Sequence, residues 1–331
     1  MPERRAPRVS VVMSVFNDSE RLRTAVASIL GQTWRDLELI VIDDGSTDGS
    51  GELLDELAAA DVRLRVIHQD NTGLTRALIR GCSETRGEFI ARQDSDDWSH
   101  PQRIAEQVAL LDGDPGIGFV SCATQYLGPA DEPLCVISRT TDSVQATEGL
   151  LHRREGPPAH GSVMFRSTLY REVGGYRGQF RYSQDSDLWL RMGERARIGY
   201  VPGIRYAHRK DAASTSGAAR PAQRRFGELG HLCRKSRLAG QSEQPWLDEA
   251  ETLSARVRDG VAQDPRARRR AMADANYLLG SILTASKNTR AQIYLLEAIR
   301  LIPLRPKPWI RLVQSGLTGR KVPAFDFEDA R

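Results

Sequence analysis

Two groups of acidic side chains follow apolar stretches of the sequence, at the point where each stretch ends. Asp43-Asp44 closes one stretch, and the segment Asp94–Asp97, with three aspartates, closes another. Carboxylates held close together repel each other unless a cation or the donors of a ligand neutralise them. Oxygen ligands suit Mg²⁺ or Mn²⁺, which also bind diphosphate oxygens and stabilise the charge of a departing diphosphate. The two groups therefore predict a divalent metal and a nucleotide-diphosphate donor.

A simpler explanation exists for each group taken alone. Asp and Gly after a strand form turns and cap helices, so Asp43-Asp44-Gly45-Ser46 is by itself as readily a turn as a ligand site. Two such groups at strand ends in one chain are harder to explain in this way. Their joint occurrence favours the metal and donor interpretation.

The elements that would position these groups can be predicted from the apolar pattern. Residues 8–16, 37–42, 62–68 and 87–92 are rich in β-branched and apolar side chains and predict buried strands. Between these strands lie segments whose apolar residues recur at helical spacing. This alternation of strands and helices predicts parallel βαβ units. Ligands of such open sheets bind beyond the carboxyl ends of the strands. We therefore expect the acidic groups and the segment Phe16-Asn17-Asp18 to meet at one rim.

The middle of the chain completes the same domain. Residues 118–126 and 134–138 predict antiparallel strands, and a helix is expected to begin near Asp185. We expect residues 1–215 to form an α/β domain and residues 216–331 to form a mostly helical region.

The C-terminal region is more basic than the rest. From residue 220 to the end there are 21 Lys and Arg against 12 Asp and Glu, whereas the whole chain has 47 against 43. Stretches 268–285 and 290–302 have apolar residues at helical spacing, and the prolines from Pro303 to Pro308 are expected to end the last helix. One apolar stripe, Ile293, Leu296, Ile299 and Ile302, would either bind an anionic membrane surface or pack on the α/β domain.

Composition narrows the class of protein. The chain has 331 residues, of which 40% are hydrophobic and 27% charged, as in ordinary globular proteins. No apolar run approaches the roughly 18–20 residues of a membrane-spanning helix. The four cysteines form no CxxC pair, which favours a reducing compartment. We expect a cytoplasmic protein, with peripheral association at the inner face of the cell membrane as a variant of that prediction.

An ordered series of motifs identifies a family. VSVVMSVFND, ELIVIDDGSTDGS, DNTGLTRAL, GEFIARQDSDDWSHPQRIAEQ, HGSVMFR and GGYRGQFRYSQDSDLWLRM follow one another along the chain. This series resembles the inverting family 2 glycosyltransferases of bacterial surface glycans, over roughly residues 8–215. The resemblance implies the GT-A fold, an α/β, Rossmann-like fold with a mixed, mostly parallel central sheet flanked by helices, here with a C-terminal helical extension.

The resemblance also implies roles for individual residues. Asp185, in SQDSDLW, matches the family's catalytic base, and His208, in YAH, matches a segment near the diphosphate and the metal. Asp96 is the expected metal ligand, with Asp97 as its competitor. The residues expected to bind the donor are Ser14, Phe16, Asn17, Asp44, Asp94, Ser95, Asp96 and Asp97.

Two positions depart from the family pattern. Gln184 stands before Asp185 where the family often has Glu, and Ile79 stands where Asn is frequent. Asp185 by itself could also be a helix cap, because acidic residues stabilise helix N-termini.

The resemblance implies a sugar transferase that uses a nucleotide-sugar, most simply a UDP-sugar, and a glycan or lipid-linked saccharide acceptor. The alternative function is a non-catalytic module that binds a nucleotide-sugar or an anionic partner through its basic region. The intact acidic residues favour the enzyme, because a binding module needs no base. Nucleic acid is excluded as a partner, because the basic stretch lacks interleaved aromatic residues. The oligomeric state is left open by the sequence.

Overall fold

The computed structural model describes residues 6–210, 220–258, 265–318, 322 and 324–325. Its centre is a nine-stranded sheet in the order β3-β2-β1-β4-β8-β6-β9-β5, with β7 paired to β6. The strands are β1 Val9–Val15, β2 Leu37–Asp43, β3 Leu64–His68, β4 Phe89–Asp94, β5 Trp98–Ser99, β6 Ile117–Leu127, β7 Pro133–Ile137, β8 Met164–Arg166 and β9 Arg197–Arg209. Strands β1 to β4 pair in parallel, which confirms the predicted βαβ units, and the β6–β7 pair is antiparallel, as expected.

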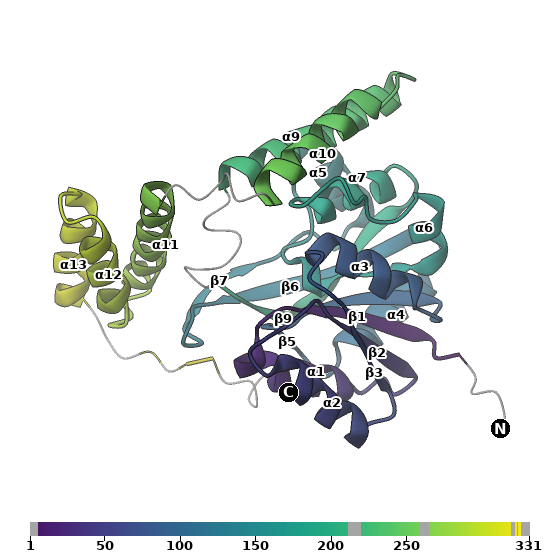
Figure 1. Cartoon of the computed structure of the whole chain (residues 1–331), viewed down its shortest axis with the longest axis horizontal. Helices are drawn as coiled ribbons and strands as arrows, with labels where there is room; N and C mark the ends of the chain where they lie inside the picture. The colour runs from purple at the N-terminus through teal and green to yellow at the C-terminus, as the bar shows by residue number, and fades with distance from the viewer. Residues whose placement is uncertain (1–5, 211–219, 259–264, 319–321, 323, 326–331) are drawn as a thin grey trace.

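Helices cover both faces of this sheet (Figure 1). The α/β part contains α1 Ser19–Leu30, α2 Ser50–Ala60, α3 Leu74–Ser83, α4 Arg103–Gly113, α5 Ser143–Arg153, α6 Ser167–Glu172 and α7 Gln184–Gly193, with a short 3₁₀ turn at His160–Ser162. Helices α1, α2 and α4 form one core with Val11 and Met13 of β1, whereas α3, α5 and α7 form a second core that includes Val12. Neighbouring residues of β1 thus face opposite layers, as the two-residue period of a strand requires.

The first two C-terminal helices pack on the α/β part. Helices α9 Arg220–Leu238 and α10 Gln244–Arg258 share an apolar cluster with Phe180, which precedes α7. Two ion pairs, Arg237 with Glu194 at 3.0 Å and Arg177 with Glu243 at 2.6 Å, join the same parts. The domain boundary expected at residue 215 falls among residues 211–219, which lie outside the described residues, and it stays a prediction.

The last three helices form a separate group, which we call the C-terminal unit, at the left of Figure 1. It consists of α11 Pro265–Ala285, α12 Ala291–Leu301 and α13 Pro306–Thr318. Its core joins the β7 side of the sheet through Leu134. Close to this contact, the Tyr294 hydroxyl donates to Glu132 at 2.8 Å.

The prolines end α12 at Leu301, as expected. The helix that follows, α13, was not predicted from the sequence, and Pro306 is its first residue. The first N–H groups of a helix have no partner within the helix, so proline costs nothing there and its fixed φ favours the start. The proline-rich stretch therefore separates two helices, and the chain returns to helical structure after it.

The apolar stripe predicted on α12 is divided between buried and exposed positions. Ile299 is buried, whereas Ile293 and Leu296 are 62% and 53% exposed. A strict spacing of three residues drifts by about 60° per step around a helix of 3.6 residues per turn, so such a stripe cannot stay on one face. The residues that α12 buries are Ala291, Leu295, Ala298 and Ile299.

Candidate active site

Strand register brings the predicted acidic groups to one rim. Strand β1 lies between β2 and β4, so Val15 pairs with Asp43 on one side and Ser14 pairs with Asp94 on the other. His208 lies near the end of β9, the last strand along the chain, and reaches the same rim. The convergence expected from the strand ends is therefore present.

Asp97 and His208 form the centre of the rim. Asp97 is fully buried, and its Oδ2 lies 2.8 Å from Nδ1 of His208. The other oxygen of Asp97 accepts a hydrogen bond from the amide of Arg209 at 2.8 Å. Burial lowers the pKa of His208, but the charge of Asp97 and this contact outweigh burial, so the pKa is raised overall.

Asp94 completes a group with the donor set of a metal site. Asp94, Asp97 and His208 each offer one ligand atom, and these atoms all lie within 4.8 Å of one another. Two carboxylate oxygens and one imidazole nitrogen suit a divalent ion such as Mn²⁺. Burial raises the pKa of Asp94, although Arg92, a buried residue of β4, lies 2.8 Å from its carboxylate.

Asp96 lies beside this group but is not one of its three members. Burial, followed by repulsion from Asp97 and Asp94, raises the pKa of Asp96 to about 7. A carboxyl group in this state is readily ionised by a nearby cation, so the environment of Asp96 is compatible with a ligand. Its assignment as the metal ligand stays a prediction.

The loop after β1 is tied to the loop after β2. Asn17 has φ +53°, and its side-chain oxygen accepts a hydrogen bond from the amide of Thr47 at 2.7 Å. The backbone amide of Asn17 donates to Ser46 Oγ at 3.0 Å. Phe16 is left 51% exposed next to this anchor. A role for Phe16 in stacking on a nucleotide base stays a prediction.

Asp18, in the same loop, was expected at this rim but was not among the residues predicted to bind the donor or the metal. Ser95 Oγ donates to its Oδ2 at 2.6 Å, which fixes the β1 loop to the acidic segment after β4. Burial raises the pKa of Asp18.

Asp44 is buried and already has several partners. Its Oδ1 accepts from Gln69 Nε2 at 2.6 Å and from the amide of Thr72 at 2.9 Å, and its Oδ2 accepts from the amide of Gly73 at 2.8 Å. In this arrangement Asp44 holds the loop that leads into α3. Its predicted contact with the donor base would require it to share these oxygens with the ligand.

Asp185 lies in the first turn of α7 and is partly exposed. Its Oδ1 accepts a hydrogen bond from the backbone amide of the next residue, Ser186, at 2.8 Å. Its Oδ2 has no hydrogen-bond partner among the described residues. By contrast, Asp187 is 1% exposed and bound to Arg191 at 2.7 Å. The helix therefore holds one aspartate in its packing and leaves the other accessible.

The acid-rich rim borders a histidine that stays neutral. His160 Nε2 lies 2.6 Å from the hydroxyl of Tyr176, and its ring meets Trp189 edge-on. Burial lowers the pKa of His160 to about 3. A neutral imidazole can hold a hydroxyl group in place, but it adds no positive charge to the site.

Two basic residues after His208 also belong to the rim. Arg209 donates to the backbone oxygen of Asp96 and pairs with Asp131 at 2.6 Å. Lys210 lies 5.2 Å from the ring centroid of Tyr126, and burial lowers its pKa. His208 was predicted from the sequence, but neither of these two residues was. Two basic side chains directly after the YAH segment could have indicated a contact with the diphosphate.

The fold and the site can be compared with known proteins. The profile of the family described as Glycosyl transferase family 2 matches residues 10–134. EpsE of Bacillus subtilis (strain 168), provisionally named a glycosyltransferase, is 35% identical over 198 residues, which are 59% of this chain and 69% of EpsE. Glycosyltransferase GlyG of Streptococcus pneumoniae is 41% identical over 114 residues, 33% of this chain and 38% of GlyG.

Solved structures share the fold at low sequence identity. The mannosyltransferase PcManGT from Pyrobaculum calidifontis, in complex with GDP-Man and Mn²⁺, has a TM-score of 0.53 and 18% identity, covering 95% of this chain and 87% of its own. TarS 1–349 of S. aureus, in complex with UDP, has a TM-score of 0.54 and 13% identity, covering 92% and 89%. These similarities extend through the helices that follow the sheet.

Proposed function

The chain belongs to glycosyl transferase family 2, and from this premise we propose that it moves a sugar, with inversion, from a UDP-sugar to a hydroxyl group of a glycan or glycolipid acceptor. The observation that carries the proposal is the meeting of Asp94, Asp97 and His208 at the strand ends, with the accessible Asp185 at the start of α7. Binding of a nucleotide-sugar is supported by the GDP-Man and UDP complexes of the two similar structures.

The residues fit a divalent metal. Asp94, Asp97 and His208 would hold the ion, with Asp96 beside them, and the ion would neutralise charge on the diphosphate when bound. Lys210 and Arg209 add fixed positive charge at the same edge of the site. Mn²⁺ is the better candidate than Mg²⁺, because one of the three ligand atoms is a nitrogen.

Asp185 is proposed as the general base. Its free carboxylate oxygen would accept the proton of the acceptor hydroxyl as that oxygen attacks the anomeric carbon. The bond from the anomeric carbon to the diphosphate breaks on the opposite face, so the configuration inverts in one displacement. Asp44 would keep the α3 loop in place, and Phe16 would cover the nucleotide base.

We also infer a peripheral membrane contact for the C-terminal unit. Residues 265–318 contain ten Lys and Arg but only two Asp and Glu. At one end of the unit Leu304 is 96% exposed, and Trp309 and Ile310 are 49% and 57% exposed. Basic and exposed apolar side chains together favour an anionic bilayer. No helix among the described residues is long and apolar enough to cross a membrane.

The proposal is tested by a screen of nucleotide-sugars with Mn²⁺ and with Mg²⁺. We expect one UDP-sugar to raise the unfolding temperature in the presence of Mn²⁺ and to be hydrolysed slowly without an acceptor. Donor binding without hydrolysis or transfer to any glycan acceptor would favour the non-catalytic binding module.

A further inference from the structure

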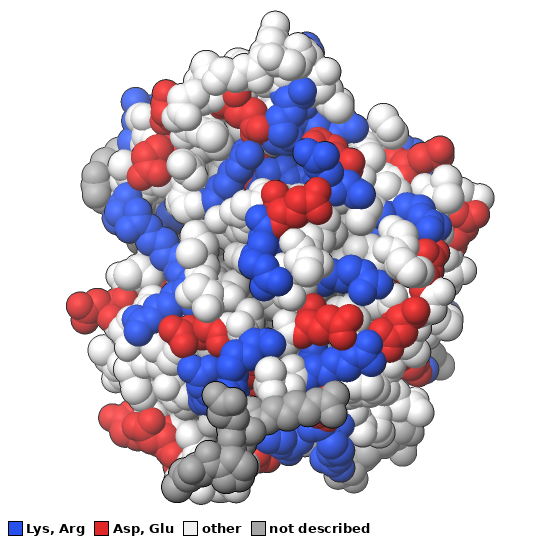
Figure 2. Space-filling view, turned by 90° about the vertical axis from the view of Figure 1, so that its right-hand side faces the viewer, with Lys and Arg blue, Asp and Glu red and all other residues white. Residues whose placement is uncertain are grey.

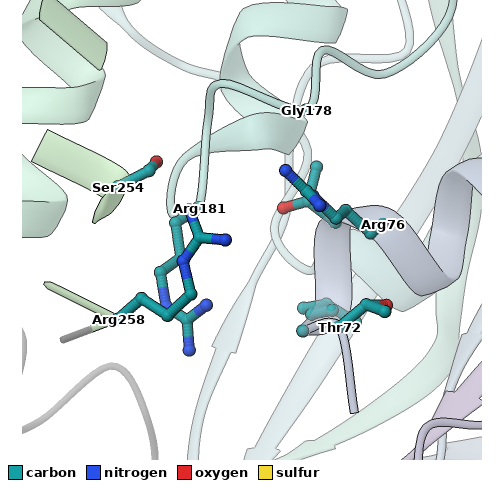
Figure 3. Close-up of a pocket in the computed structure, with 9 residues that line it drawn as sticks. Thr72, Arg76, Gly178, Arg181, Ser254 and Arg258 are labelled. Carbon is teal, nitrogen blue, oxygen red and sulfur yellow. The ribbon is translucent and has the colours of Figure 1, made fainter. Parts of the chain in front are cut away.

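A pocket with three arginines lies outside the acidic rim. Three arginines line it together: Arg76 of α3, Arg181 of the loop before α7 and Arg258 at the end of α10 (Figure 3). The cavity has a volume of about 30 Å³ and is open to solvent. The three side chains come from parts of the chain that are far apart in sequence. Their meeting in one pocket is therefore a product of the fold, in which α10 packs beside the α/β part.

We propose that this pocket binds a phosphate group of the acceptor. The inference rests on the proposed transferase function and names the chemical class of its acceptor: a phosphorylated saccharide, a polyol phosphate chain or a lipid-linked saccharide diphosphate. All three present the same group, a phosphate ester with anionic oxygens.

The charges of the pocket are not neutralised within the described chain. None of the three guanidinium groups lies within 4.0 Å of a carboxylate among the described residues, and none donates a side-chain hydrogen bond there. Arginines nearby behave differently, since Arg177 and Arg237 both bind Glu243 at 2.6–2.7 Å. Three positive charges close together repel one another, and a bound phosphate would offset this repulsion by attracting all three. Guanidinium groups also match phosphate oxygens in geometry.

The start of α3 adds to the same positive field. The amides of Leu74 and Thr75 have no acceptor among the described residues, whereas those of Thr72 and Gly73 donate to Asp44. A helix N-terminus carries partial positive charge and favours phosphate. Arg181 nevertheless lies directly over it: a Cβ on Gly73 would stand 3.1 Å from Arg181 Nη1. Gly73, at φ +88°, permits this approach, which brings a cation to a positive helix end.

The position of the pocket assigns the phosphate to the acceptor. The diphosphate of the donor is expected at Asp94, Asp97 and His208, and none of these three residues lines the pocket. Arg181 lies four residues before Asp185 in the segment that leads into α7. A phosphate held by Arg181 would thus be bound by the same segment that presents the proposed base.

The test compares Arg181→Gln/Arg258→Gln with wild type in the full-length protein. Inorganic phosphate is titrated with EDTA present, so that phosphate bound through a metal ion at the acidic rim does not contribute. We expect the phosphate-dependent rise in unfolding temperature to require at least tenfold more phosphate in the double variant. Arg171→Gln, an exposed arginine on α6, is the matched control and should behave like wild type. Arg181→Lys/Arg258→Lys should recover part of the response.

Two further arms identify the source of the phosphate. Glucose 1-phosphate is titrated in the same way, and vesicles with phosphatidic acid are tested by co-sedimentation. A response to glucose 1-phosphate alone indicates a soluble phosphosaccharide, whereas vesicle binding that the double variant loses indicates a lipid-linked one. Equal phosphate responses of wild type and the double variant would overturn the proposal. Because no turnover is measured, a failed donor screen with an intact phosphate response would refute only the transferase proposal.

Discussion

The rim of the sheet and the C-terminal unit both gather charge, but they hold it in opposite ways. At the rim the charges are largely buried and paired, as Asp97 is with His208 and Asp94 with Arg92. In the C-terminal unit both acidic residues are already paired, Asp274 with Arg305 and Glu297 with Arg300, so the excess of arginine and lysine is not balanced by acidic residues of the unit itself. The rim charges are held in place by the ends of the strands, whereas the charges of the C-terminal unit lie on the surfaces of its helices.

One face of the molecule shows a third arrangement. On the face seen in Figure 2, Lys and Arg alternate with Asp and Glu over the whole view. Mixed charge of this kind gives no long-range field. We propose that the charges of the rim serve donor and metal binding and that those of the C-terminal unit serve a membrane contact. The following variants test these two roles separately.

The largest effect is expected at the rim from Asp185→Asn. Loss of a general base lowers the transfer rate by on the order of 10²–10⁴-fold. Donor affinity, measured by calorimetry with Mn²⁺, should change little, because the base acts on the acceptor. Asp187→Asn is a poor control because that side chain is buried in an ion pair, so Ser186→Ala serves instead. A parallel fall of donor affinity and rate would refute the role of Asp185.

The next effect distinguishes the candidate metal ligands. Asp97→Asn removes a member of the Asp94, Asp97 and His208 group and should weaken Mn²⁺-dependent UDP binding by roughly 10–100-fold. Asp96→Asn is the companion variant, since the family resemblance favours that residue. If Asp96→Asn abolishes the Mn²⁺ effect and Asp97→Asn preserves it, Asp96 is the ligand and Asp97 only orients His208.

A smaller effect is expected in the C-terminal unit from Leu304→Ser/Trp309→Ser. Co-sedimentation with anionic vesicles at low salt should fall several-fold, because exposed apolar side chains contribute to insertion. Val62→Ser, a 74% exposed residue of the α/β part, is the matched control. The rate of transfer to a soluble acceptor should not change. Wild-type protein that ignores anionic vesicles, or binding that persists at high salt, would refute the electrostatic membrane contact.

The smallest effect concerns stability near the rim. Hydrogen bonds to Asp43 and then Asp55, at 2.8 and 3.0 Å, raise the pKa of His68 above its ordinary value of 6.5. Its contribution to stability is therefore complete below pH 6.5 and is lost as pH rises through the raised pKa. Since the side chain is 48% exposed, the difference between wild type and His68→Asn should be at most about 1 kcal/mol.

Denaturant unfolding at several pH values measures this difference. We expect wild type to lose its advantage over His68→Asn as the pH rises above 6.5. His152→Asn, an exposed histidine of α5, should leave the pH dependence unchanged. An advantage that grows with pH would contradict the assigned direction.

Sequence and structure agree best where the local pattern and the fold require the same thing. The four parallel strands were predictable because their apolar runs are short, β-branched and separated by helical spacing. Helix α13 was missed because proline was taken as an end, although proline is equally suited to a helix start. The division of the α12 stripe follows from the drift of a three-residue spacing around the helix, so it could have been predicted. Only the identity of the buried members depends on how α12 packs against α11 and α13.

The sequence by itself determined the four parallel strands, the helices between them, the acidic groups at strand ends and the family to which the chain belongs. These follow from residue types and spacing, which are local properties. Only the tertiary structure decided that Asp97 and His208, 111 residues apart, share a contact of 2.8 Å, and that Arg76, Arg181 and Arg258 line one pocket. Such contacts depend on strand register and on how helices pack, and these are set by the burial of the whole chain.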